Sequence, residues 1–363
     1  MASQVAIDHS GVAPPPGRRL FFHGDGFTLL GIYIINLLLT VVTLGLYYPW
    51  ARTRIRTYLL SQTEFEADRF AWHGSGKELL IGFIKIAVLF LILSGAAAVV
   101  RFGWHHPARE AALTLAGYLI GLVLVPIGMV GARRYRLSRV SWRGIRFSFR
   151  GRAREFVRVF IPGVLLSTMT LGLYYPFFQN NMRRYLVNHS FFGTVPFVYN
   201  GRGRDLFMRL LLTLGLAIAV VGGLGFLYIF RSTSVGADAA IVGIGFAVIS
   251  VGMLGISWFW YAAYRHRYYW AHTSFAGTYF RSTVFAARLL GLTLTNLLLG
   301  VITLGLALPW VLIRNLRFFF ANVGLEAPLD LAAIHQDAQA ASATGEALGD
   351  ALDIGFFDVD LAI

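Results

Sequence analysis

Arginine residues stand beside aromatic residues in five short clusters, which carry the strongest chemical signal in the sequence. The clusters cover residues 52–58, 133–136, 183–185, 264–268 and 314–318. Guanidinium groups bind phosphate and carboxylate through paired hydrogen bonds, and the chain has a formal net charge of +14. The clusters follow apolar stretches, which favours anionic lipid headgroups as partners over nucleic acid. A purely structural role, in which the arginines only orient the chain in a membrane, stays open beside this interpretation.

Two histidines occupy matching positions, His23 in HGDG and His73 in HGSG. The corresponding residues in later copies of this pattern are Arg150 and Asn200. A metal site needs ligands that converge, so this exchange favours a polar strand end over a zinc ligand. His105 and His106 are adjacent in a short loop, where we expect solvation. We predict no metal-binding residues.

We find no GxSxG, HExxH or glycine-rich phosphate-loop motif in the structural context that catalysis would require. The chain has no cysteine, which excludes disulfides and thiolate chemistry. No Asp or Glu lies inside an apolar stretch, and this disfavours a carrier with a carboxylate proton relay. We therefore predict no enzyme activity, no catalytic residues and no cofactor.

Long apolar stretches must position the arginine clusters. The chain is 56% hydrophobic and 14% charged, with a mean hydropathy of +0.62, which leaves too little polar surface for a soluble globule of 40.2 kDa. Stretches without Asp, Glu, Lys or Arg cover residues 26–51, 86–100, 111–132, 159–182, 210–230, 239–264 and 289–313. Most exceed the ~20 residues that cross a bilayer. We predict a mainly α-helical, polytopic membrane protein with about seven hydrophobic segments.

The heptapeptide TLGLYYP occurs at residues 43–49 and 170–176 and returns as TLGLALP at 303–309. The recurrence of this heptapeptide predicts internal repeats over 19–145 and 146–278 and a partial repeat over 279–326. A flexible arm is expected at 1–18. An acidic tail without Lys or Arg is expected at 327–363, with a docking segment at 354–357.

Short aromatic segments recur as RLFFHG, RFAWHG, RFSFRG, PFVYNG and the degraded YFRST. Large residues at every second position indicate strands with one buried face, followed by a glycine turn. We expect these strands to form a small cytoplasmic layer.

The basic residues suggest how the segments cross. If segments one, four and seven enter and leave on one face, all Lys and Arg except Lys85 and three arginines (Arg101, Arg109 and Arg231) share the strand face. If all seven segments cross, the bias is weak. The first arrangement needs breaks in the re-entrant helices, and Asn36, Gly163 and Asn296 are the predicted positions, each seven residues before TLG.

The stretches TLGLYYPWARTRIRTYLL, GIRFSF and TLGLYYPFFQNNMRRYLV resemble the YjgN-like family of bacterial inner-membrane proteins, a family of unknown function. The third copy departs from the motif at Ala307 and Leu308. The resemblance implies a location in the bacterial cytoplasmic membrane. The apolar stretches predict several passes, and the positive-inside rule predicts that the basic loops lie in the cytoplasm. It supplies no substrate and no catalytic residues.

Two functions follow as hypotheses. The first is a transporter or channel for a small or anionic solute, because internal repeats with broken helices line polar pathways in many carriers. The second is a nonenzymatic scaffold that binds anionic lipid. The residues predicted to form the motif or lipid interface are Tyr47, Tyr48, Pro49, Trp50, Arg52, Arg56, Tyr174, Tyr175, Pro176, Arg183, Arg184, Pro309, Trp310, Arg314 and Arg317.

Overall fold

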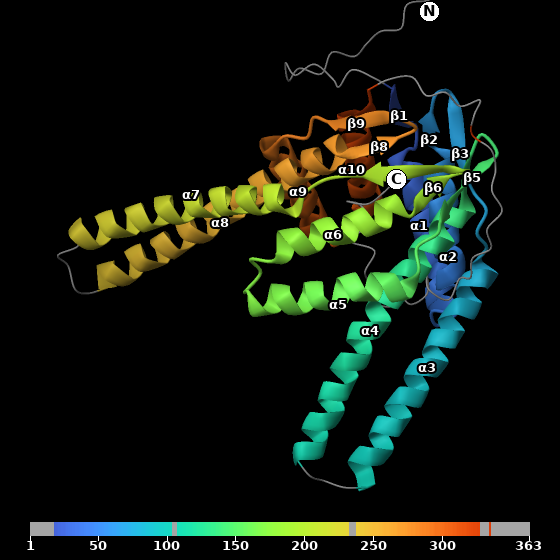
Figure 1. Ribbon diagram of the computed structural model, residues 1–363, viewed down its shortest axis with the longest axis horizontal. Helices are drawn as coiled ribbons and strands as arrows, with labels where there is room; N and C mark the ends of the chain where they lie inside the picture. The colour runs from blue at the N-terminus through green and yellow to red at the C-terminus, as the bar shows by residue number, and fades with distance from the viewer. Residues whose placement is uncertain (1–17, 104–106, 232–236, 327–333, 335–363) are drawn as a thin grey trace, which may run out of the picture.

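The computed structural model describes residues 18–103, 107–231, 237–326 and 334 (Figure 1). The described residues form five successive units with the same order: strand, helix, helix, strand. The first three units are β1 (Arg18–Phe22), α1 (Gly26–Val42), α2 (Tyr48–Ser61), β2 (Thr63–Phe65); β3 (Asp68–Trp72), α3 (Gly76–Gly103), α4 (Pro107–Arg139), β4 (Val140–Trp142); and β5 (Ile145–Phe149), α5 (Ala153–Met169), α6 (Tyr175–Asn188), β6 (Ser190–Phe192). The last two are β7 (Val195–Tyr199), α7 (Gly203–Arg231), α8 (Ala237–Ala271), β8 (Thr273–Phe275); and β9 (Thr278–Ser282), α9 (Ala286–Ile302), α10 (Leu308–Asn322), β10 (Val323–Leu325).

All ten strands pair antiparallel in one closed barrel. Within each unit the two strands pair at the end nearest the helices, as Phe22 does with Thr63 and Phe149 with Ser190. Tight turns join neighbouring units at the opposite end, and β1 pairs with β10 to close the ring. Closure removes the free edges that a small open layer would expose.

The five aromatic strands predicted from the sequence are confirmed as β1, β3, β5, β7 and β9. The predicted small layer is wrong, because five further strands of three residues each complete a barrel. These short strands, such as Ser190–Phe192, are too brief to show a period of two in the sequence.

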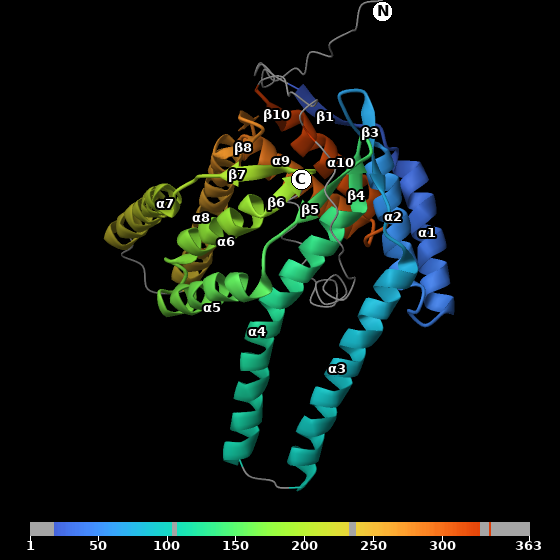
Figure 2. The ribbon, with the colours of Figure 1, turned by 45° about the vertical axis from the view of Figure 1, so that its right-hand side comes forward.

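Four helices are long and apolar enough to cross a membrane: α3, α4, α7 and α8, over Gly76–Val99, Ala108–Arg139, Gly203–Phe226 and Gly243–Ala271. At most 22% of the most apolar window of each helix is buried within the chain. Figures 1 and 2 show α3 with α4, and α7 with α8, projecting from the barrel as two separate pairs. The prediction of seven hydrophobic segments is therefore corrected to four long helices and three short hairpins.

The three short hairpins are α1–α2, α5–α6 and α9–α10, and each turns within the TLG motif. Helix α1 ends at Val42 and α2 begins at Tyr48, with Leu44 at φ 49° and Gly45 at φ 91° between them. Both left-handed residues stop the first helix. The proline of the motif lies in the first turn of the second helix, in all three hairpins.

The predicted helix breaks are wrong, because α1, α5 and α9 run without interruption through Asn36, Gly163 and Asn296. All three residues are buried against the returning helix. Asn36 donates to the carbonyl of Ala51 at 3.3 Å, and Asn296 donates to the side chain of Asn315 at 2.8 Å. These small or polar residues allow close helix contact.

Candidate functional site

Four of the five units are held to the next unit at the segment between a strand and the following helix. Arginines near the ends of α4, α6, α8 and α10 donate to backbone carbonyls there: Arg134 to Gly151 (2.6 Å), Arg184 to Gly201 (2.6 Å), Arg267 to Val284 (2.7 Å) and Arg317 to Gly24 (2.8 Å). The residue after each arginine is Tyr135, Tyr185, Tyr268 or Phe318. Two of the predicted lipid arginines, Arg184 and Arg317, therefore make structural contacts.

The neighbouring tyrosines instead join the two helices of one unit, because each contacts the first turn of the preceding helix or the residue just before it. Tyr135 donates to Glu78 at 2.9 Å, and Tyr268 donates to Asp205 at 2.6 Å. Tyr185 donates to the carbonyl of Arg152 at 2.7 Å, and burial together with the charge of Glu155 raises its pKa to about 12. The Tyr185 hydroxyl is therefore a permanent donor at neutral pH.

Most of the remaining motif residues contact other residues of the helices. Pro49, Pro176 and Pro309 are buried. Ring contacts and hydrogen bonds place the rest: Tyr47 stacks on Trp50 (6.1 Å), Tyr48 meets Phe83 (5.7 Å), Tyr174 stacks on Phe177 (5.4 Å), the Tyr175 hydroxyl accepts from Gln179, and Trp310 meets Phe27 (5.3 Å). Trp50, Phe177 and Trp310 also lie against Gly76, Gly203 and Gly26, where a Cβ atom would collide with them. The motif therefore joins neighbouring units.

The other predicted arginines divide between the hairpins and the interior. Arg52 lies over the ring of Tyr48 at 5.8 Å, and Arg314 donates to Thr295 at 2.9 Å. Arg56 lies over Trp72 at 5.3 Å. Arg183 is 4% exposed and lies over Tyr269 at 4.5 Å.

Arg183 shares a small cavity with Arg133, at the end of the barrel that faces the helices. The cavity has a volume of about 20 Å³ and is also lined by Val187, Ser190, Phe197, Trp270 and Thr273. Arg133 is 9% exposed and donates to the Ser190 hydroxyl at 3.3 Å. Two guanidinium groups at one cavity repel each other, so an anion between them is stabilised.

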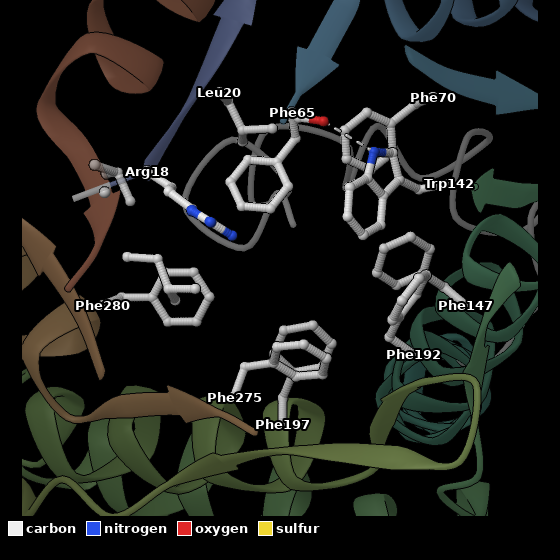
Figure 3. Close-up of a pocket in the computed structure, with 13 residues that line it drawn as sticks. Arg18, Leu20, Phe65, Phe70, Trp142, Phe147, Phe192, Phe197, Phe275 and Phe280 are labelled. Atoms are coloured by element: carbon white, nitrogen blue, oxygen red, sulfur yellow. Dashed lines mark hydrogen bonds between the residues drawn. The ribbon is translucent and has the colours of Figure 1, made fainter. Parts of the chain in front are cut away.

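The barrel interior is lined by aromatic rings. Figure 3 shows Phe65, Phe70, Trp142, Phe147, Phe192, Phe197, Phe275 and Phe280 around a cavity of about 80 Å³. The wall is less bulky where β1 meets β10, because Leu20, Gly324 and Leu325 stand there. Ile334, which is 5% exposed, packs among Trp142, Phe147, Phe192 and Phe275. The predicted docking segment at 354–357 lies outside the described residues.

The tips of the three short hairpins expose leucine almost completely. Leu44, Leu171 and Leu304 are 94%, 95% and 93% exposed. Each tip is held by its threonine, as the Thr43 hydroxyl donates to the carbonyl of Leu39 at 2.7 Å and accepts from the amide of Tyr47 at 3.0 Å. A rigid tip that presents a large apolar side chain is suited to a lipid environment.

A groove between α7 and α8 is the largest cavity that we describe, with a volume of about 250 Å³. Its walls are mainly apolar: Leu212, Thr213, Leu216, Ala217, Val220, Met253, Ile256, Ser257 and Trp260. Arg209 lies at the end near the barrel, and its guanidinium group is 4.8 Å from the ring centre of Tyr264. Its Nε atom is buried and makes no hydrogen bond within the described residues. Arg209 is not among the interface residues predicted from the sequence.

The histidines lie in separate polar contacts. His23 is 3.0 Å from the Glu64 carboxylate, and His73 is 2.7 Å from the Ser141 hydroxyl. Within the described ranges, no group of three or more His, Cys, Asp or Glu could hold a metal ion. His105 and His106 lie outside those ranges.

The fold and these surfaces define the class: a polytopic α-helical membrane protein whose long helices and short hairpins all start from one closed β-barrel. The chain belongs to the DUF898 family, bacterial proteins of unknown function, whose family model matches residues 18–351. The resemblance recognised in the sequence is therefore confirmed.

Similar proteins carry a name that gives their location. The chain is 30% identical over 159 residues to inner membrane protein YjgN of Escherichia coli (strain K12), a match that covers 43% of this chain and 37% of the relative. Inner membrane protein YjgN of Salmonella typhimurium (strain LT2) is 29% identical over 159 residues, covering 43% and 38%. The match thus spans less than two fifths of these relatives' length. No solved structure matches the chain.

Proposed function

We propose that this protein is a membrane-embedded scaffold that binds anionic phospholipid in the groove between α7 and α8. The supporting observation is the groove of about 250 Å³ that ends at Arg209. Arg209 and Val220 are eleven residues apart on one helix, a length of about 16 Å. An acyl chain fits the apolar walls, and the headgroup phosphate lies at Arg209, near the barrel.

The hairpin tips support the same function. Leu44, Leu171 and Leu304 insert into the leaflet nearest the barrel, which places lipid headgroups around the bases of the hairpins. Exposed basic residues occupy the first turns of three helices that leave the barrel, namely Lys77, Arg154 and Arg204. Helix N-termini add partial positive charge to the same zone. These features favour an anionic leaflet around the barrel.

We infer that the barrel faces the cytoplasm. The relatives are named inner membrane proteins, and the barrel side carries nearly all of the Lys and Arg in the sequence. Basic residues are retained on the cytoplasmic side of a membrane.

Native mass spectrometry of the detergent-purified protein, incubated with phosphatidylglycerol or phosphatidylcholine, tests the lipid site. Arg209→Gln should weaken retention of phosphatidylglycerol about fivefold, since one interfacial arginine contributes about 1 kcal/mol. Ala217→Leu fills the groove wall and should weaken retention of both lipids. Arg158→Gln is the matched control, because it removes an exposed arginine near the start of α5. Unchanged retention in both groove variants would refute the proposal.

Transport of a small or anionic solute is the second candidate. The cavity between Arg133 and Arg183 favours a small anion at the junction of barrel and helices. We rank transport second because the long helices of one chain project as two pairs, and an enclosed pathway would then require further chains. Solute flux in proteoliposomes that exceeds empty vesicles, and that is lost in Arg183→Gln while the protein stays folded, would reverse this ranking.

A further inference from the structure

We infer that the groove between α7 and α8 selects a phospholipid whose headgroup is a phosphate monoester, with the phosphate held between Arg209 and Arg267. This selection rests on the proposed function, since lipid must first occupy the groove. It adds a second arginine to the headgroup end of the groove and assigns that end to a phosphate with two negative charges.

Arg267 on α8 brings a second positive charge to the barrel end of the groove. The guanidinium group of Arg209 lies 4.8 Å from the centre of the Tyr264 ring. Tyr264 and Arg267 are three residues apart on α8, so they are neighbours on one face of that helix. The positive charges of Arg209 and Arg267 are close enough to repel each other. Both guanidinium groups therefore adjoin the place where a headgroup would lie.

No carboxylate of the described residues forms an ion pair with either arginine. Asp205, one turn before Arg209 on α7, accepts instead from the Tyr268 hydroxyl at 2.6 Å. Arg267 donates from one amino group to the carbonyl of Val284 at 2.7 Å. The buried Nε atom of Arg209 makes no hydrogen bond within the described part of the chain. Donors on both guanidinium groups are therefore left for an anionic ligand.

The two charges favour a phosphate monoester over a phosphodiester. A phosphate monoester carries a charge of about −1.5 to −2 at pH 7 and presents three acceptor oxygens. The phosphodiester of phosphatidylglycerol carries a single negative charge, which leaves one guanidinium charge unmatched. A diphosphatidyl lipid has two charges, but they lie on separate phosphates. Because Arg209 and Arg267 adjoin the same tyrosine, one doubly charged phosphate matches them best.

The other pair of long helices supplies an internal comparison. Gly82 is the seventh residue of α3, where α7 has Arg209 as its seventh residue. Arg134 of α4 corresponds to Arg267, because each donates to a carbonyl two residues before the next helix. The α3–α4 pair thus keeps the arginine that contacts the backbone and has glycine in place of its partner. Arg134 is therefore a matched control for Arg267.

Native mass spectrometry of the full chain in detergent tests the selection, with phosphatidic acid, phosphatidylglycerol and cardiolipin of matched acyl chains. We expect phosphatidic acid to be retained about fivefold more than phosphatidylglycerol, since one interfacial arginine contributes about 1 kcal/mol. Arg267→Gln should bring this ratio close to one. Arg134→Gln removes the equivalent backbone contact, 2.6 Å long in the unmodified protein, and should leave the ratio unchanged.

Three results would overturn the inference: equal retention of phosphatidic acid and phosphatidylglycerol, stronger retention of cardiolipin than of phosphatidic acid, or the same loss of ratio in Arg134→Gln. If Arg267→Gln does not fold, Ala217→Leu decides the question. Filling the groove wall should remove the excess retention of phosphatidic acid, whereas a persistent excess would place the monoester elsewhere.

Ala217→Leu also separates this inference from the proposed function. If the two lipids are retained equally and Ala217→Leu weakens both, the groove binds lipid without selecting a monoester, and only the inference fails. If Ala217→Leu and Arg209→Gln weaken neither lipid, the groove is not a lipid site, and the proposed function fails with the inference.

Discussion

Gly163 shows how a single position can be recognised in the sequence and still be misinterpreted. Like Asn36 and Asn296, it lies seven residues before a TLG motif, and we predicted a helix break at all three positions. The helix is continuous there, and Phe178 of the returning helix fills the space over Gly163. A residue without a side chain breaks a helix in some contexts and admits a neighbour in others. Only the position of the second helix distinguishes the two.

Gly163→Ala should destabilise the protein by about 1–3 kcal/mol, because the added methyl group collides with the Phe178 ring. Thermal or denaturant unfolding in detergent measures the change. Gly31→Ala is the control, since a Cβ at Gly31 in α1 meets no atom within 4 Å, and it should stabilise the helix by up to about 1 kcal/mol. Equal effects at the two sites would contradict the packing role.

Asp25 caps α1 through its carboxylate, which accepts from the amides of Phe27 at 2.9 Å and Thr28 at 3.0 Å. The Thr28 amide is the main cause that lowers the pKa of Asp25, and the Phe27 amide adds to it. Since the folded-state pKa is lowered, the cap stabilises the fold above the ordinary pKa of about 4. The stabilisation is lost as the pH falls through the folded-state value.

Asp25→Ala should therefore lower Tm at pH 7, and the difference from the unmodified protein should shrink as the pH falls below about 4. Asp25→Asn keeps an acceptor but not the charge, so its Tm at pH 7 should lie between those of the other two proteins and should change less with pH. Thermal melting of the three proteins at several pH values measures this. A constant difference between Asp25→Ala and the unmodified protein across the range would show that the carboxylate charge has no role.

At the scale of elements, the TLG turn explains why hydropathy overestimated the number of spanning segments. The charge-free stretch 26–51 contains α1, a turn and the start of α2. A turn normally interrupts an apolar run with polar residues, because it faces water. Here the turn presents Leu44 and Leu46, which are 94% and 67% exposed. A turn that faces lipid has no need of polar residues, so the run continues through it.

Leu171→Cys, labelled with an environment-sensitive fluorophore in lipid nanodiscs, should be quenched by spin-labelled acyl chains. Leu171 is 95% exposed, so the substitution removes little internal packing. The free energy of unfolding should change by less than about 0.5 kcal/mol. Ala67→Cys, in the exposed turn between β2 and β3, is the control and should not be quenched. Equal quenching at both sites would mean that the tip lies outside the lipid.

At the scale of the whole molecule, the barrel decides where every pair of helices begins and ends. Strands β1 and β2 pair directly, so α1 and α2 must leave and return on one side. The same holds for β5 with β6 and for β9 with β10. The arrangement in which segments one, four and seven enter and leave on the same face therefore follows from strand pairing. The repeat boundaries at 19–145, 146–278 and 279–326 stay a prediction.

Single cysteines should reveal this topology in membrane vesicles. Thr194→Cys and Ala276→Cys, in exposed turns between units, should react with an impermeant thiol reagent from the same side. His105→Cys, in the connection between α3 and α4, should react from the opposite side. Labelling of Thr194→Cys and Ala276→Cys from opposite faces would contradict a single barrel.

The amino-acid sequence alone determined the lipid-adapted composition, the five aromatic strands and the three TLG positions, because each is a local pattern of hydrophobicity, period or backbone conformation. Only the tertiary structure decided that ten strands close into a barrel, that three short hairpins leave it and return on the same side, and that Arg133 and Arg183 share a buried cavity. The closing contact joins Arg18 to Leu325. Backbone pairing between residues so distant leaves no periodic signal in the sequence. An arginine next to an aromatic residue also gives the same sequence pattern whether lipid or protein surrounds its side chain.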